Sequence, residues 1–285
     1  MTFQNQRICQ SEPLSLADVL SADQQGGLRW FDETHTCSLH GPFRARIVML
    51  GDVKVSDGVC PECERLKRLA DERERAKIEA QRAAEEARQR MEKALGRSCI
   101  PQDFLDKSFE NFVADTENLC GALDLSKRFV KGWEKAKAAG YGLFFYGKPG
   151  TGKTHLATSI LKCLMPGVNG LYTRVSDMIG YIRTGWRSES PVSAYQAARH
   201  YVDIELLVID ELGVQVGSIS EQTLLFEVID ARLSENRPTI FLSNLSPSEI
   251  VGVIGERLAD RIKGKCVPYC FTGKSRRRAL SASVF

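Results

Sequence analysis

The residues from Leu143 to Thr158 constrain this 285-residue chain more than any other stretch. They open with a short apolar run, 143–146, whose length and composition are those of a buried strand. Gly147 to Thr154 then read G-x-x-x-x-G-K-T, and a helical pattern follows. A strand, a loop with this spacing and a helix are together typical of a phosphate-binding loop. The sequence therefore predicts a site for a nucleoside triphosphate.

The residue types in this loop fit the chemistry of phosphate. Glycines at positions 147, 150 and 152 would let backbone N–H groups point at a phosphate without interference from side chains. Lys153 would reach the β- and γ-phosphates of ATP, and the Thr154 hydroxyl would bind magnesium. The predicted nucleotide contacts are Gly147, Lys148, Pro149, Gly150, Thr151, Gly152, Lys153, Thr154 and His155.

Polar side chains follow two further apolar runs. Asp210 and Glu211 come directly after 206–209, and Asn244 comes just after 239–242. Ligands of open parallel sheets bind outside the carboxyl ends of the strands. Asp210 is therefore predicted to hold magnesium, and Glu211 to accept a proton from an attacking water. Asn244 would orient the same water; stabilisation of its own turn is the alternative role.

From residue 98 onward, short buried runs alternate with amphipathic helical patterns. This alternation predicts an α/β fold in which a parallel sheet is covered by helices on both faces. The hydrophobic content of 43% is ordinary for a globular protein, so a sizeable core can form. The formal net charge of +3 is mild, so local basic patches matter more than the total.

Two short motifs set the N-terminal part of the chain apart. Cys37 and His40 form one pair with a two-residue gap, and Cys60 and Cys63 form another. Four such ligands suit a closed tetrahedral zinc site, and the alternation over 43–55 resembles the hairpin of a small zinc ribbon. So short a segment needs a metal to fold, because its core is small. Ordinary reduced cysteines are the alternative interpretation.

Composition divides the chain into three parts. Residues 64–97 are rich in Ala, Glu, Arg, Lys and Gln, which favours a charged helical linker. The N-terminal region 1–63 would hold the zinc module at about 35–63, and 98–285 would form the nucleotide-binding domain. No apolar run approaches the roughly 20 residues of a membrane span. Nine cysteines without an export signal predict a cytoplasmic protein.

The order of these motifs resembles that of the AAA+ ATPases. The phosphate loop, the Asp-Glu pair, a strand followed by Asn, and the run from Gly255 to Arg261 occur in the order of that family. Within it, the chain is similar to the DnaC-type bacterial and phage helicase loaders. The stretches that carry this resemblance are 100–104, 109–112, 152–157 and 207–213. The resemblance implies an AAA+ core that hydrolyses ATP, with Phe104 and Phe109 beside the adenine.

The same resemblance implies roles for arginines. In that family, ATP is hydrolysed between the subunits of an oligomer, and an arginine of one subunit reaches the nucleotide of its neighbour. Arg261 would be this arginine finger, with Arg257 as the second choice. A sensor-two arginine near the C-terminus would be Arg277, with Arg276 and Arg278 left open.

The resemblance also implies partners, namely a hexameric replicative helicase and single-stranded DNA in DNA replication. The helix predicted over 176–186 occupies the region that lines a DNA channel in such proteins. The side chains expected to face DNA are Arg174, Arg183, Trp186 and Arg187. Packing of Trp186 in the core is an equal alternative. The zinc module occupies the N-terminal position at which the best-known loaders have a helical domain that binds the helicase.

Three other functions stay open at this point. An IstB-like ATPase regulator of DNA transposition would have a similar core and would assemble on duplex DNA. A P-loop small-molecule kinase shares the phosphate loop but would need a lid with substrate-binding arginines. A zinc-bearing DNA adaptor would use ATP only to control its own assembly.

Overall fold

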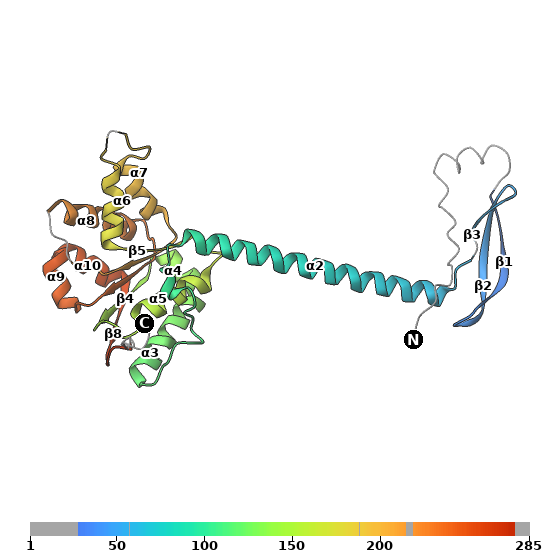
Figure 1. Ribbon diagram of the computed structural model, residues 1–285, viewed down its shortest axis with the longest axis horizontal. Helices are drawn as coiled ribbons and strands as arrows, with labels where there is room; N and C mark the ends of the chain where they lie inside the picture. The colour runs from blue at the N-terminus through green and yellow to red at the C-terminus, as the bar shows by residue number, and fades with distance from the viewer. Residues whose placement is uncertain (1–27, 57, 188, 215–218, 277–285) are drawn as a thin grey trace, which may run out of the picture. The chain divides into compact units, whose positions relative to one another are not determined.

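The chain divides into two compact units, Met1–Glu85 and Glu86–Phe285. A three-stranded sheet belongs to the first unit and a five-stranded sheet to the second. The computed structural model, drawn in Figure 1, describes residues 28–56, 58–187, 189–214 and 219–276. No helix within these ranges is long and apolar enough to cross a bilayer.

The sheet of the first unit is antiparallel, with the strand order β1-β2-β3. Its strands are β1 (Leu28–Cys37), β2 (Gly41–Leu50) and β3 (Val53–Ser56). Ala45, Ile47 and Leu50 of β2 are buried, which gives the unit only a small core. The pairing of β2 with β3 confirms the hairpin predicted over 43–55. The strand β1 extends this hairpin on its other side.

Helix α2 (Pro61–Arg97) is continuous and has no buried residue among those described. It starts three residues before position 64, the predicted start of the charged helix. Ion pairs along its surface join Glu62 to Arg65 at 2.9 Å and Glu86 to Arg90 at 3.2 Å. Each exposed pair contributes only about 0.3–0.5 kcal/mol, so the helix also depends on the high helix propensity of its Ala, Glu, Arg and Lys residues.

The sheet of the second unit is entirely parallel, with the strand order β5-β6-β7-β4-β8. Its strands are β4 (Gly142–Gly147), β5 (Gly170–Arg174), β6 (Leu206–Asp210), β7 (Thr239–Ser243) and β8 (Cys266–Phe271). Since β6, β7 and β4 are neighbours and run in one direction, their carboxyl ends meet at one edge. The phosphate loop, the Asp-Glu pair and Asn244 all follow these ends.

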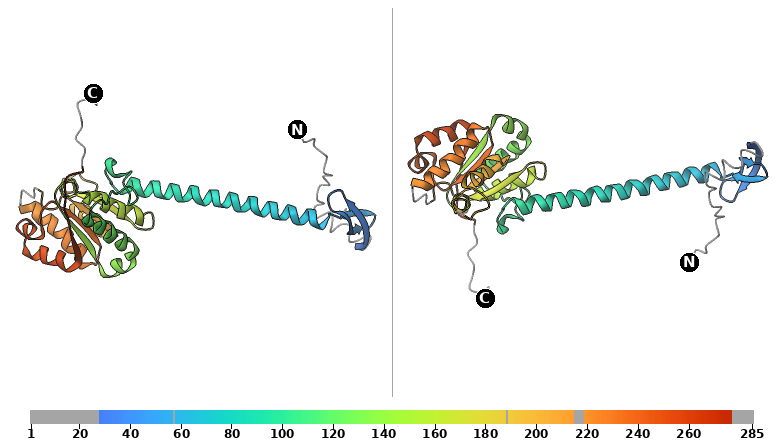
Figure 2. Two further views of the ribbon diagram at one scale, coloured as in Figure 1. Left: turned by 90° about the horizontal axis from the view of Figure 1, so that it is seen from below. Right: turned by 90° about the horizontal axis from the view of Figure 1, so that it is seen from above.

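Helices cover both faces of this sheet, as predicted (Figure 2). Leu143 and Phe145 of β4 pack on one face, and Phe144 packs on the other, because side chains alternate along a strand. The first face is covered by α3 (Glu117–Lys131), α4 (Trp133–Ala139) and α5 (Lys153–Leu164). The second is covered by α6 (Val175–Thr184), α7 (Ala194–Asp203), α8 (Ile219–Ser234), α9 (Pro247–Ile254) and α10 (Glu256–Lys265). The α/β prediction is confirmed.

Candidate nucleotide-binding site and metal centre

The loop between β4 and α5 has the backbone that its glycines allow. Gly147, Gly150 and Gly152 have φ angles of 130°, 78° and 105°, which residues with a Cβ rarely adopt. A Cβ on Gly147 would lie 2.2 Å from the carbonyl oxygen of Phe271, so this position also lacks the space for a side chain. The loop can form because glycine occupies the positions with positive φ angles, and because Gly147 leaves room for the backbone of β8.

Lys153 lies inside the loop, with 7% of its surface exposed. Its Nζ donates to the carbonyl oxygens of Gly147 at 2.7 Å and Lys148 at 2.9 Å. It also donates to the Asn244 side-chain oxygen at 3.0 Å, which brings two predicted site residues into contact. The ammonium is therefore held at the mouth of the loop, where a phosphate would be bound.

The Asp210 carboxylate accepts three hydrogen bonds at the end of β6. The Thr154 hydroxyl donates at 3.0 Å, the Tyr172 hydroxyl at 2.7 Å, and the backbone N–H of Glu211 at 2.7 Å. The pair of Thr154 and Asp210 has the hydroxyl and carboxylate oxygens that suit magnesium. Burial and the neighbouring Asp210 raise the pKa of Tyr172. Tyr172 was not predicted, because only the strand order places β5 beside β6.

Glu211 adopts a left-handed backbone conformation, with a φ of 61°. This is uncommon for a residue with a Cβ, and such conformations concentrate at functional sites. Its side chain lines the same pocket as Asp210 and Asn244. The turn thus presents a carboxylate next to the positions predicted for magnesium and the phosphates.

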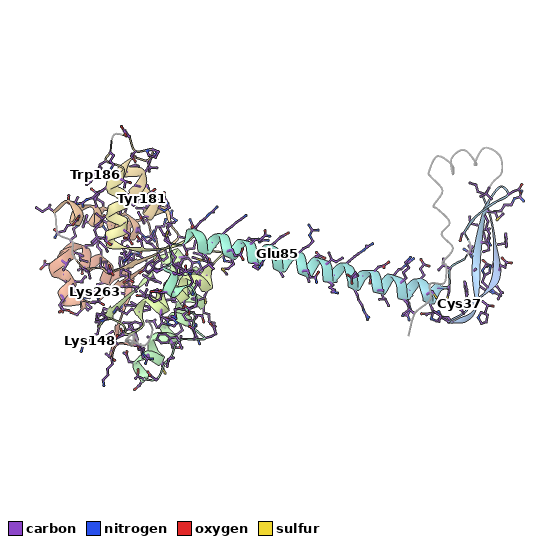
Figure 3. All side chains as sticks on the ribbon, viewed as in Figure 1. Cys37, Glu85, Lys148, Tyr181, Trp186 and Lys263 are labelled. Atoms are coloured by element: carbon purple, nitrogen blue, oxygen red, sulfur yellow. The ribbon has the colours of Figure 1, made fainter. Side chains whose placement is uncertain are left out.

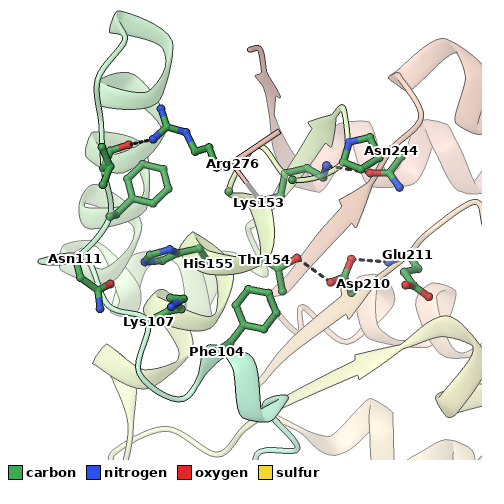
Figure 4. Close-up of a pocket in the computed structure, with 15 residues that line it drawn as sticks. Phe104, Lys107, Asn111, Lys153, Thr154, His155, Asp210, Glu211, Asn244 and Arg276 are labelled. Atoms are coloured by element: carbon green, nitrogen blue, oxygen red, sulfur yellow. Dashed lines mark hydrogen bonds between the residues drawn. The ribbon is translucent and has the colours of Figure 1, made fainter. Parts of the chain in front are cut away.

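A pocket of about 530 Å³ lies against the loop (Figure 4). The predicted residues that line it are Pro149, Gly150, Gly152, Lys153, Thr154, His155, Asp210, Glu211 and Asn244. Further residues that line it are Phe104, Lys107, Asn111, Phe112, Val113 and Arg276. Gly147, Lys148 and Thr151 belong to the loop but not to this lining. Phe104 is at the pocket as expected; Phe109 does not line it, whereas Phe112, which is buried in the same core as Phe109, does.

The arginines divide into two groups. Arg276 lines the pocket, donates to the carbonyl oxygen of Val113 at 2.9 Å and forms an ion pair with Asp115. Arg277, predicted as the sensor-two arginine, lies outside the described residues. Arg261 and Arg257 are on α10 and do not line the described pocket.

The two α10 arginines are both in contact with α8. Arg261 forms an ion pair with Asp230 and donates to the Ser234 hydroxyl at 2.7 Å. The guanidinium of Arg257 lies 5.7 Å from the centre of the Phe226 ring. Their predicted role in a neighbouring subunit stays a prediction.

The position of Trp186, just after α6, bears on its two predicted roles, which were packing in the core and contact with DNA. This side chain is 56% exposed, so packing in the core is wrong (Figure 3). The guanidinium of Arg183 lies 6.0 Å from its ring centre and forms an ion pair with Glu221 at 2.8 Å. Arg174 forms an ion pair with Asp177 at 3.0 Å, and Arg187 is exposed.

The first unit gathers its four predicted ligands. The ligand atoms of Cys37, His40, Cys60 and Cys63 all lie within 4.8 Å of one another. His40 Nδ1 is 3.7, 3.6 and 3.3 Å from the Sγ atoms of Cys37, Cys60 and Cys63, and the Sγ atoms of Cys37 and Cys63 are 3.6 Å apart. Zinc bonds of about 2.3 Å to sulfur imply tetrahedral edges of roughly 3.8 Å. The donor set and its spacing therefore fit zinc.

Comparison with known proteins identifies the family. The profile of the IstB-like ATP binding protein family matches residues 137–279, half of the chain. The replicative helicase loader DnaC of Buchnera aphidicola subsp. Baizongia pistaciae is 31% identical over 198 residues, which are 69% of this chain and 79% of that protein. DnaC of Escherichia coli strain K12 is 34% identical over 175 residues, 61% of this chain and 70% of that protein.

A solved structure shows the same fold. The crystal structure of the DnaC helicase loader matches with a TM-score of 0.56 at 21% identity, over 60% of this chain and 100% of that one. The chain binds ATP, and residues of its phosphate loop and its Asp-Glu pair line one pocket. The chain belongs to the IstB-like ATP-binding family and is an ATP-hydrolysing AAA+ ATPase.

Proposed function

We propose that this protein is an ATP-controlled loader that delivers a hexameric replicative helicase onto single-stranded DNA in DNA replication. The observation that carries the proposal is the match to relatives named replicative helicase loader DnaC over as much as 69% of this chain. The match is accompanied by a pocket that brings together Lys153, Asp210, Glu211 and Asn244. The P-loop kinase alternative is set aside, because the chain belongs to an AAA+ family.

At the nucleotide, each side chain has a defined task. Thr154 and Asp210 would hold magnesium, which would neutralise charge on the β- and γ-phosphates. Lys153 would move its hydrogen bonds from the loop carbonyls to the same phosphates. Glu211 would take a proton from the attacking water, and Asn244 would orient that water through its amide.

The site would be completed by a second copy of the chain. Arg261 of a neighbouring subunit, or Arg257 as the second choice, would stabilise the charge that develops on the transferred phosphoryl group. Support comes from their position on α10, since neither lines the pocket of its own chain. Arg277 would act as sensor two.

Two further elements would serve the partners. Arg174, Arg183, Trp186 and Arg187, on and beside α6, offer cations and an exposed aromatic ring for sequence-tolerant binding of single-stranded DNA. Zinc at Cys37, His40, Cys60 and Cys63 would fold a module at about 35–63. We keep this N-terminal region of 1–63, a linker over 64–97 and an ATPase domain over 98–285 as the proposed domain organisation.

A second candidate is an IstB-like regulator of DNA transposition, which is supported by the match to a family described as IstB-like ATP binding proteins. The two are separated by mixing the purified protein and ATP with the replicative helicase of its cell, or with duplex DNA. A loader should form a stoichiometric complex with the helicase and should prefer single-stranded to duplex DNA. ATP-dependent assembly on duplex DNA without a helicase complex would instead support transposition. Assembly with ATP but without turnover would support the adaptor function.

A further inference from the structure

A lysine beyond the phosphate loop is surrounded by backbone carbonyl groups. Lys162 of α5 donates from Nζ to the carbonyl oxygens of Phe104 at 2.8 Å, Leu105 at 3.0 Å, and Lys107. An ammonium group has three N–H donors, so these carbonyls use all of them. Burial lowers the pKa of Lys162, and the nearby Asp106 carboxylate opposes that shift. The Lys162 ammonium is therefore partly buried and held by specific hydrogen bonds, unlike a lysine on the open surface.

These three carbonyls belong to one turn of the backbone, residues 104–108. The other two carbonyls of this turn also accept hydrogen bonds from side chains. His155 Nε2 lies 2.8 Å from the carbonyl oxygen of Ser108, and this nitrogen must donate because a carbonyl only accepts. The Asn111 amide donates to the carbonyl oxygen of Asp106 at 2.7 Å. Five consecutive carbonyl groups thus accept hydrogen bonds from side chains, and the shape of the turn depends on them.

This turn forms one wall of the ATP pocket. The side chains of Phe104 and Lys107 line the pocket, whereas Lys162 is not part of its lining. Lys162 and His155 are seven residues apart on α5, so they lie on one face of that helix. The helix that begins at the phosphate loop therefore also holds this wall of the pocket.

We infer that Lys162 is a positioning residue for the nucleoside part of ATP, because it holds the backbone that presents the Phe104 ring to the base. An aromatic ring can stack on a base, and its contribution depends on accurate placement. The phosphate contacts proposed for Lys153 and the loop glycines come from residues outside this turn. The inference rests on ATP binding alone and not on helicase loading.

Lys162→Met tests this role, because methionine keeps the apolar stem and removes the three donors. The Kd for Mg-ATP, measured by calorimetry, should rise on the order of tenfold as stacking on Phe104 is weakened. The Kd for Mg-tripolyphosphate, which has no nucleoside, should stay unchanged, as should kcat at saturating ATP. Lys131→Met, which removes an exposed lysine of α3, is the matched control and should change neither constant.

A double mutant shows whether Lys162 acts through Phe104. Phe104→Ala should weaken ATP binding by itself, and adding Lys162→Met should then weaken it little further. If Lys162→Met does not fold, Lys162→Gln, which keeps two amide donors, should show a smaller loss confined to ATP. Equal losses for ATP and tripolyphosphate, independent losses in the double mutant, or unchanged ATP affinity would overturn the inference. A failure of the protein to bind a helicase would refute the proposed loader function but not this role of Lys162.

Discussion

Lys153→Ala should leave the protein unable to bind ATP at physiological concentrations. The ammonium is the group held at the mouth of the loop, and it would meet both the β- and γ-phosphates. A hydrogen bond to a charged group contributes about 1.5–3 kcal/mol. Loss of the contacts with two phosphates should therefore lower the affinity by roughly a hundredfold or more. Calorimetric titration with Mg-ATP measures this loss.

Glu211→Gln is the matched control for this substitution. It changes a neighbouring side chain of the same pocket but removes only the ability to accept a proton. It should bind ATP with near-normal affinity and hydrolyse it very slowly. Normal ATP affinity in Lys153→Ala would refute the assignment of the lysine. Hydrolysis by Glu211→Gln at the wild-type rate would refute the assignment of the base.

Cys60→Ser should remove zinc and unfold the small sheet of the first unit. Purified wild-type protein should contain one zinc per chain, bound by Cys37, His40, Cys60 and Cys63. Structural zinc contributes on the order of 10 kcal/mol to small domains, and the core of Ala45, Ile47 and Leu50 is too small to replace it. Metal analysis measures the zinc, and proteolysis reports the unfolding of β1 to β3.

The ATP site should be unaffected by this loss, because it is built in a compact unit with a separate core. Cys120→Ser provides the matched control, since Cys120 is an exposed thiol of α3 outside the ligand set. It should retain full zinc content. Substoichiometric zinc in wild-type protein prepared with reductant, or full zinc in Cys60→Ser, would contradict the site.

Much of the ATP site could be predicted because its motifs are short and each one lies at the carboxyl end of its own strand. The phosphate loop is contiguous, and its glycines report the backbone angles that they adopt. Asp210 and Asn244 were predicted to converge because the carboxyl ends of parallel strands share one edge. The zinc ligands could be predicted for a similar reason, since the two ligands of each pair are only three positions apart in the sequence.

The parts that could not be predicted depend on contacts between distant segments. Tyr172 reaches Asp210 only because β5 is the neighbour of β6. Arg276 bonds to Val113, 163 positions away in the chain. Phe109 and Phe112 carry the same apolar signal in the sequence and are both buried in the core, so only the packing shows that Phe112 also lines the pocket.

If ATP is hydrolysed at a site completed by a neighbouring subunit, the arginine finger and the phosphate loop act from different copies of the chain. Arg261→Ala should bind ATP nearly normally and hydrolyse it poorly, because the finger acts on charge that develops in the transition state. Asp230→Asn is its control, since it removes the ion pair within the chain but keeps the arginine. Substitution of Lys153 disables a subunit's own site and leaves its finger intact.

Mixing Arg261→Ala with Lys153→Ala is the most direct measurement of this claim. Some interfaces in the mixture would pair an intact phosphate loop with an intact finger. Two nearly inactive proteins should together regain ATPase activity, most strongly with single-stranded DNA present. Recovery with Arg257→Ala in place of Arg261→Ala would keep the shared site and move the finger to Arg257. No recovery at any ratio, with co-assembly demonstrated independently, would show that the site is not shared between subunits.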